Sequence, residues 1–106
     1  MNYTKVKFEI YVPFSHVNKL REAINNTGAL IIGKYDNCIS ITEVTGYFRP
    51  LKSSNPYLGK ENELSIEKEA KMEFRCDKDL AIEVINVIKA IHPYEEPEYH
   101  IIPIIN

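Results

Sequence analysis

The stretch HPYEEPEYH, residues 92–100, gathers side chains that can bind metals or small ligands. It holds two histidines, three glutamates, two tyrosines and two prolines within nine residues. Each proline disfavours helical geometry in the residue before it, so the stretch is expected to be extended and rigid. In an extended chain residues two apart share a face, which brings His92, Tyr94 and Glu96 together. The stretch therefore predicts either a ligand site or a rigid connector between a helix and a strand.

A divalent metal, zinc or copper, is one candidate ligand of this stretch. Imidazole, carboxylate and thiolate groups are ligands that these metals accept in proteins. The residues that could supply them are His92, Glu96, His100 and the more distant Cys38. In the alternative interpretation, the glutamates pair with lysine or arginine side chains of a neighbouring subunit. His92 then hydrogen-bonds its own turn.

Two other segments can contribute to a site for a small ligand. Arg49 precedes a proline at the mouth of a long loop, and its guanidinium group suits a carboxylate or a phosphate. An ion pair with a glutamate of a neighbouring subunit is the alternative role for this arginine. Asp36 can either face a ligand or shape a turn. The candidate ligand-binding residues are therefore Tyr35, Asp36, Arg49, His92, Tyr94, Glu95 and Glu96.

Hydrophobic periodicity predicts the elements that must position these residues. Residues 5–13 alternate apolar and polar side chains, which is typical of a half-buried strand. Further patterns predict a helix at 15–28, a strand within 38–44, a loop at 49–63, a strand at 65–76, a helix at 77–91 and a strand at 98–105. The core-facing side chains of the first and third strands are expected to be Val6, Phe8, Ile10, Val12, Ala70, Met72, Phe74 and Cys76.

Residues that favour helix ends mark the boundaries of the two helices. Ser15 is expected to cap the start of the first helix, and Asp77 or Asp79 the start of the second. Gly28 follows the first helix, where a glycine with positive φ commonly ends the helical turn.

The order strand–helix–strand–strand–helix–strand predicts an α+β fold of the ferredoxin-like, split βαβ type. One antiparallel sheet is then covered by two helices on one face. Gly46 marks a bulge or a close backbone approach, and Pro103 marks an edge strand or a departure from regular pairing. The other sheet face is expected to be buried in an oligomer or against a second domain. Apolar side chains expected to contribute to it are Tyr11, Ile39, Ile41 and Tyr47.

Composition places the chain among ordinary globular proteins. Its 106 residues suffice for a single domain, residues 1–106, and the net charge of −2 argues against binding to nucleic acid. No apolar run is long enough for a membrane span, and the first residues lack the apolar centre of a signal peptide. We therefore expect a cytoplasmic protein, in which Cys38 and Cys76 are free, buried thiols.

Four segments resemble the inserted domain of the Nif-three-like proteins, also called GTP cyclohydrolase I type 2 homologues. They are KYDNC (34–38), TGYFRPL (45–51), SNPYLG (54–59) and HPYEEPEYHIIPI (92–104). That inserted domain is PII-like or CutA-like, with a ferredoxin-like fold, and the resemblance covers nearly the whole chain. The last segment is also similar to the end of CutA, the divalent-cation tolerance protein.

The resemblance implies a homotrimer, as in CutA and PII proteins, with the uncovered sheet face buried. It also implies that the chain is not an enzyme, because the dinuclear metal centre of the larger family lies in flanking domains absent from this sequence. We therefore expect a small, non-catalytic binding or regulatory module of the PII/CutA-like type. Such a module would bind a small ligand or a divalent metal at clefts between subunits. The alternative is an interaction subunit that docks on a partner, such as a Nif-three-like protein, without a ligand of its own.

Overall fold

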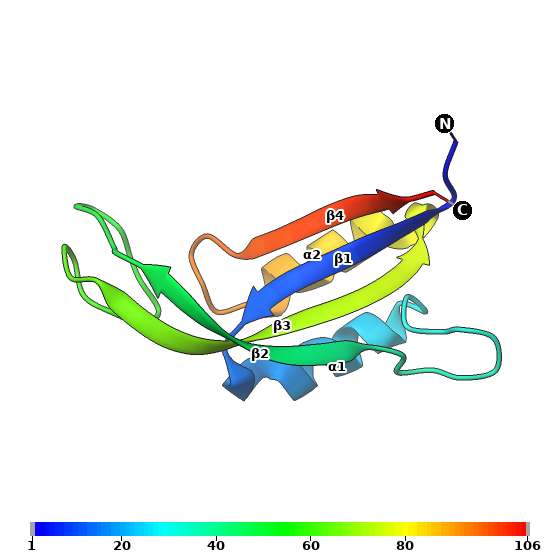
Figure 1. Ribbon diagram of the computed structural model, residues 1–106, viewed down its shortest axis with the longest axis horizontal. Helices are drawn as coiled ribbons and strands as arrows, with labels where there is room; N and C mark the ends of the chain where they lie inside the picture. The colour runs from blue at the N-terminus through cyan, green and yellow to red at the C-terminus, as the bar shows by residue number, and fades with distance from the viewer. Residues whose placement is uncertain (1, 106) are drawn as a thin grey trace.

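The alternating segment near the N-terminus forms an inner strand of a four-stranded antiparallel sheet (Figure 1). The computed structural model describes residues 2–105, and the order of strands in the sheet is β2-β3-β1-β4. Short 3₁₀ turns at Phe14–His16 and Lys78–Leu80 precede the two helices. The main elements are β1 (Lys5–Val12), α1 (Val17–Asn26), β2 (Ser40–Phe48), β3 (Ser65–Asp77), α2 (Ala81–Ile91) and β4 (Glu98–Ile104). This order confirms the predicted split βαβ fold.

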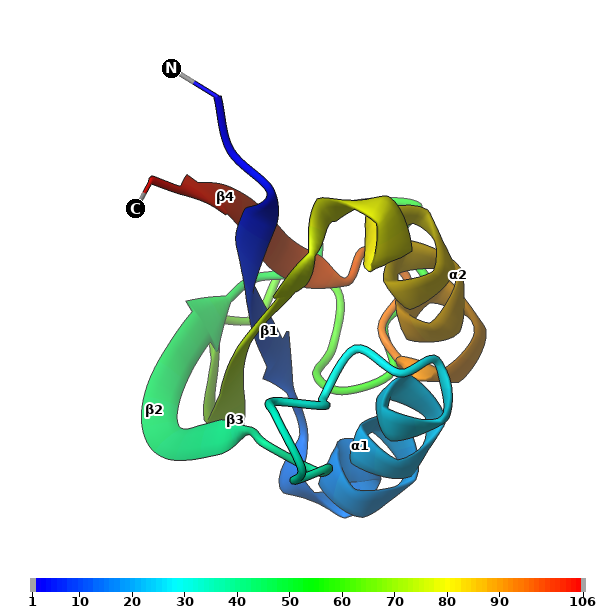
Figure 2. The same cartoon turned by 90° about the vertical axis from the view of Figure 1, so that its right-hand side faces the viewer.

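Both helices cover the same face of the sheet, as the end-on view shows (Figure 2). Phe8 is fully buried beneath them and stacks on Phe74, with ring centroids 5.1 Å apart. The predicted inward side chains of β1 and β3 are all buried, which confirms the period-two pattern. The helices complete the core with Val17, Leu20, Ile24, Val84 and Ile88.

The predicted N-caps are wrong for both helices. Neither helix has a side-chain hydrogen bond at its N-cap, because a 3₁₀ turn leads into each one. The Ser15 hydroxyl lies 2.8 Å from His16 Nδ1 instead, and Asp77 is the last residue of β3. The C-terminal signal of the first helix is confirmed: Gly28 has φ +88° and directly follows the C-cap residue Thr27.

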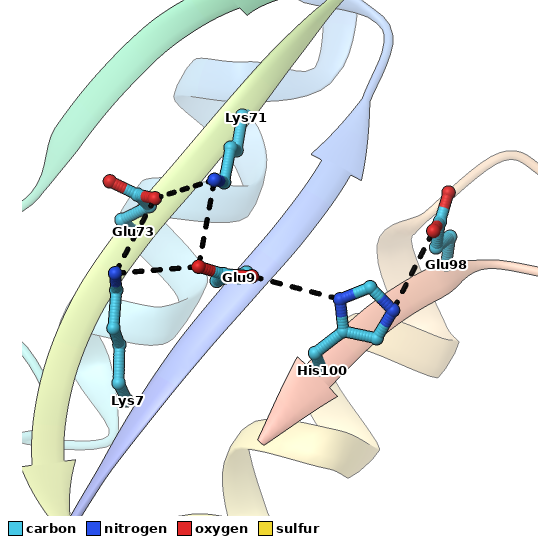
Figure 3. Close-up of polar contacts among 6 residues, drawn as sticks. All are labelled: Lys7, Glu9, Lys71, Glu73, Glu98 and His100. Atoms are coloured by element: carbon cyan, nitrogen blue, oxygen red, sulfur yellow. Dashed lines mark ion pairs between the residues drawn. The ribbon is translucent and has the colours of Figure 1, made fainter. Parts of the chain in front are cut away.

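The uncovered face of the sheet carries a network of ion pairs (Figure 3). Lys71 Nζ lies 2.9 Å from a Glu73 carboxylate oxygen and 3.5 Å from one of Glu9. Lys7 contacts the same two carboxylates, at 3.3 Å from Glu9 and 3.5 Å from Glu73. The hydrogen bond from Lys71 lowers the pKa of Glu73 below its ordinary value. His100 Nδ1 approaches Glu9 from β4, at 3.7 Å.

This network corrects the expectation of a largely apolar uncovered face. Tyr11 does lie on that face, because it pairs in register with Lys71. Ile39 instead packs against the core, and Ile41 lies opposite the buried Met72 on the helix-covered face. The register between β2 and β3 decides this placement, because it sets Ile41 opposite an inward residue of β3.

The edge position predicted for Pro103 is confirmed, because β4 pairs only with β1. Both cysteines are free; Cys76 is buried as expected, whereas Cys38 is only half-buried. Within residues 2–105, no helix combines the length and the apolar character that a membrane crossing requires.

Candidate functional site

The connector between α2 and β4 is held by its first histidine. His92 Nε2 lies 2.6 Å from the backbone oxygen of Tyr11, and the Tyr94 backbone N–H donates to His92 Nδ1 at 3.1 Å. Since Nδ1 accepts a hydrogen bond, this pattern assigns the proton to Nε2, which donates to the carbonyl. The ring thus ties the connector to the end of β1, and both of its nitrogens are occupied.

Burial keeps this histidine neutral. His92 is 7% exposed, and burial lowers the pKa of its ring below 6.5 even though the Tyr11 carbonyl favours the protonated form. A neutral imidazole is also what the geometry requires, because protonation would remove the acceptor that the Tyr94 N–H uses. The role of His92 is therefore that of a structural joint.

A cavity of about 410 Å³ opens between this connector and the long loop that follows β2. Its walls come from residues 47–58 on one side and from residues 94–98 on the other, and the ends of β1 and β3 complete it. Aromatic and apolar side chains form most of the lining: Tyr11, Tyr47, Phe48, Pro50, Leu51, Pro56, Tyr57, Leu58 and Tyr94.

Tyr94 is the centre of the aromatic wall. Its ring centroid lies 4.9 Å from that of His92, 6.1 Å from that of Tyr57 and 6.2 Å from that of Phe48. Tyr57 in turn meets His16 edge-on, with centroids 5.8 Å apart. These contacts connect the loop and the connector to each other and to the 3₁₀ turn before α1, which lies outside the cavity lining.

Backbone hydrogen bonds shape the loop on the other side of the cavity. The Asn55 N–H donates to Glu95 Oε1 at 3.0 Å, which ties the loop to the connector. Asn62 N–H donates to the oxygen of Pro50 at 2.6 Å and closes the loop on itself. Glu95 therefore positions the loop as well as lining the cavity.

Glu69, from β3, lies at the cavity as a buried carboxylate. The residue is 8% exposed, and no ion pair to its side chain is present among residues 2–105. The hydroxyl group of Tyr94 is buried beside it and interacts with the Glu69 carboxylate, although not at ideal hydrogen-bond geometry. Burial of the hydroxyl and the negative charge of Glu69 both raise the pKa of Tyr94, so the phenol stays protonated.

Gly46 explains how the Glu69 side chain fits. A Cβ at this position would lie 1.9 Å from Glu69 Oε1, so any larger residue forces the carboxylate to move. The strand pairs regularly across this residue, with Gly46 opposite Glu67. The prediction of a bulge is therefore wrong. The glycine does mark a close approach, but the approaching group is the Glu69 side chain and not another backbone segment.

We expect Gly46→Ala to reveal this contact in a double-mutant cycle. In the natural sequence the new methyl group displaces the Glu69 carboxylate, and the free energy of unfolding should fall by about 1 kcal/mol. In a Glu69→Ala background the same change should instead stabilise the strand by up to about 1 kcal/mol, because alanine is favoured over glycine there. Urea unfolding of the four proteins measures both values. Equal effects in the two backgrounds would contradict the proposed contact.

The structure brings together four of the predicted ligand-binding residues: Arg49, Tyr94, Glu95 and Glu96 all line the cavity. His92 lies behind Tyr94 rather than in the lining. Tyr35 and Asp36 belong to a separate turn, in which Tyr35 bridges to Ile32 and Asp36 contacts Asn25. That turn and the loop after β2 lie at opposite ends of the sheet in Figure 1.

The four predicted metal ligands do not converge. His92 is buried with both nitrogens occupied, while His100 lies on the open sheet face between Glu9 and Glu98. Glu96 lines the cavity, and Cys38 donates to the Asp36 oxygen at 3.6 Å in the separate turn. Among the described residues, no group of three or more histidine, cysteine, aspartate or glutamate side chains is arranged to hold a metal ion.

Glu69 and Tyr57 line the cavity, although the sequence did not indicate either residue as part of a site. Glu69 occupies an outward position in the alternation of β3, where a charged residue normally reaches solvent. It is buried because the connector and the loop pack over that end of the strand. A glycine inside a strand pattern, Gly46, was the available signal for this close packing.

The sequence is similar to one part of several larger proteins. The chain is 35% identical, over 100 residues, to the GTP cyclohydrolase 1 type 2 homolog of Halalkalibacterium halodurans, covering 94% of this chain and 27% of that protein. The resemblance to Nif-three-like proteins is confirmed. The chain thus spans about a quarter of the length of the curated relatives it matches. No protein-family model matches it.

Solved structures support the same relationship. A Bacillus cereus protein related to NIF3 superposes with a TM-score of 0.83 at 30% identity, over 98% of this chain and 26% of that one. The divalent ion tolerance protein CutA1 from Ehrlichia chaffeensis superposes with a TM-score of 0.70 at 18% identity, over 100% of this chain and 86% of that one. At that identity the second match shows the fold alone. The chain therefore has a CutA-like fold and corresponds to one segment of the Nif-three-like proteins.

Proposed function

We propose that the chain is a small binding or regulatory module of the PII/CutA-like type, which holds a small ligand in the cavity between residues 47–58 and the 92–97 connector. The observation that carries this proposal is Glu69, a buried carboxylate with no ion-pair partner among the described residues, at a cavity of about 410 Å³. That volume lies within the roughly 300–1,000 Å³ typical of small-molecule sites. We propose a binding role rather than a catalytic one.

Burial of polar groups at the cavity has an energetic cost that a ligand could offset. A buried polar group without a hydrogen bond destabilises a protein by about 1–3 kcal/mol, and a charged group by more. The Tyr94 hydroxyl has no partner at good hydrogen-bond geometry, and Glu69 has no cation beside it among residues 2–105. A ligand that hydrogen-bonds both groups would recover this energy on binding, which makes them suited to recognition.

The proposal includes a homotrimer, in which the open sheet face is covered by neighbouring copies. The ion pairs of Lys7 and Lys71 with Glu9 and Glu73 support it, because they leave opposite charges matched within one protomer. Covering these four side chains leaves none of their own charges unpaired. Tyr35 lies outside the cavity of its own protomer and takes no part in the proposed site. Free cysteines are compatible with the cytoplasmic location that we also propose.

Two tyrosines allow a matched test of the site. We expect fragments from a small-molecule library to shift the NMR signals of cavity residues in the natural protein. Tyr94→Ala should abolish these shifts, because it removes the central ring of the wall. Tyr35→Ala should leave them unchanged, since Tyr35 is 76% exposed and lies outside the cavity. Fragment binding that survives in Tyr94→Ala, or that is lost in Tyr35→Ala, would refute the proposed cavity site.

Native mass spectrometry tests the assembly and the metal alternative together. We expect a trimer, and we expect added zinc or copper to leave its mass unchanged after buffer exchange. Stoichiometric retention of either metal would favour a metal module over the small-ligand module.

An interaction subunit is the second candidate function, and exposed apolar side chains favour it. Leu64 and Ile66, at the start of β3, are 61% and 57% exposed, and Tyr47 opposite Ile66 is 65% exposed. They lie where the end of β2 and the start of β3 extend away from the rest of the sheet (Figure 1). If Ile66→Lys abolishes binding to a Nif-three-like protein while fragments still fail to bind the cavity, this second function is favoured.

A further inference from the structure

We propose that the ligand of this cavity is an organic cation, such as a protonated amine or amidine on an apolar body. The inference rests on the proposed function, because it concerns the same cavity. It extends that function by specifying the charge and the chemical class of the ligand.

The charges around the cavity favour a cation. Four carboxylates line it, from Glu69, Glu95, Glu96 and Glu98, against the single positive charge of Arg49. Arg49 is exposed, whereas Glu69 is buried. Low exposure strengthens electrostatic interactions, so the buried carboxylate should outweigh the exposed guanidinium in selecting a ligand.

The protein supplies no cation of its own to Glu69. Lys71 is two residues along β3 on the same sheet face, but its ammonium group lies against Glu9 and Glu73. Lys7 binds the same two carboxylates. No residue in the described range 2–105 forms an ion pair with Glu69. A ligand N–H that donates to this carboxylate would therefore form a charge-assisted hydrogen bond that is missing from the protein alone.

The aromatic lining suits the remainder of such a ligand. Tyrosine and phenylalanine faces attract cations through their π electrons and also bury apolar groups. Tyr94 combines both properties at one position, because its ring is in the wall and its buried hydroxyl lies beside Glu69. An amine or amidine with several N–H groups can donate to both Glu69 and the Tyr94 oxygen.

Inorganic cations and anions fit the cavity less well. A metal ion needs several ligand atoms at short distance, and the described residues offer no such group. Glu95, which might have joined one, already accepts the Asn55 N–H. A carboxylate or phosphate ligand would face four glutamates with only Arg49 as a counter-charge.

Three probes of similar shape test the charge directly: benzylamine, benzyl alcohol and benzoate. We expect benzylamine to shift the NMR signals of Gly46, Glu69 and Tyr94 in the full-length chain. Benzyl alcohol should bind about 10-fold more weakly or worse, because it lacks the charge-assisted hydrogen bond. Benzoate should not shift the cavity signals at all.

Matched glutamate variants then identify the carboxylate that matters. Glu69→Gln should weaken benzylamine binding by about 10- to 100-fold, the effect of one hydrogen bond to a charged group. Its thermal midpoint should stay equal or rise, which shows that the fold is intact. Glu98→Gln, at an exposed position, should weaken binding by no more than about 3-fold.

The outcomes distinguish failure of the cation inference from failure of the proposed cavity site. Equal binding of benzylamine and benzyl alcohol, or no effect of Glu69→Gln, would overturn the cation inference but leave the cavity as a ligand site. Preferential benzoate binding at the cavity would do the same and assign recognition to Arg49. If no probe shifts the cavity signals, the inference is overturned and the proposed function loses its main support.

Discussion

Replacing His92 with alanine is expected to lower the free energy of unfolding by about 2–4 kcal/mol. The change removes two hydrogen bonds, each contributing about 1 kcal/mol, and leaves the Tyr11 oxygen and the Tyr94 N–H without partners. It also opens a cavity beneath the Tyr94 ring, whose centroid lies 4.9 Å from that of the imidazole. Urea unfolding of the variant and the natural protein at pH 7.5 measures the loss.

The conservative variant His92→Gln separates hydrogen bonding from titration. Glutamine can also donate one hydrogen bond and accept another, so it should recover part of the lost stability. The pKa of His92 is lowered in the folded protein, so the unfolded chain takes up a proton first as the pH falls below 6.5. The stability that neutral His92 provides is therefore complete above that pH and decreases below it. Thermal midpoints at pH 7.5 and 5.5 should fall less in His92→Gln, and an equal fall in both proteins would contradict the buried neutral ring.

Replacing Phe8 with alanine is expected to have the largest effect on stability, about 3–5 kcal/mol. Phe8 is fully buried in the middle of β1, and its ring stacks on Phe74 at an interplanar angle of 8°. The small residue would leave a void beneath both helices, which a close-packed core cannot fill by relaxation alone.

Phe14→Ala is the matched control for this loss. Phe14 lies just after β1 and is 45% exposed, so the same substitution there should cost about 1 kcal/mol or less. Urea midpoints of the two variants make the comparison. Similar losses would mean that the core is not organised around the ring pair of Phe8 and Phe74.

The fold was predictable because local pattern and burial agree along most of the chain. The alternation around Phe8 and around Met72 corresponds to buried strands, and the apolar stripe ending at Ile88 corresponds to a helix. Helix starts were less predictable. A 3₁₀ turn such as Phe14–His16 has no strong sequence signal, and Ser15 resembles a cap in composition although its hydroxyl contacts a neighbouring side chain.

The site was predictable only in part, because it depends on long-range packing. Rigidity of the HPYEEPE segment was evident from its prolines, and Tyr94, Glu95 and Glu96 do line one cavity. Burial of Glu69 depends on a loop and a connector that are far from it in sequence. Period-two reasoning places such a residue in solvent and has no means to detect that other segments cover it.

The attachment of the loop after β2 has a consequence for the rate at which a ligand exchanges. Apart from aromatic contacts, the hydrogen bond from Asn55 to Glu95 is the link between this loop and the connector. Breaking one such exposed contact requires far less free energy than unfolding the core. We therefore expect the loop to open many times during the lifetime of the folded chain, so that occupancy of the cavity follows ligand concentration without delay. In the function proposed above, such a module would respond to its ligand rather than store it.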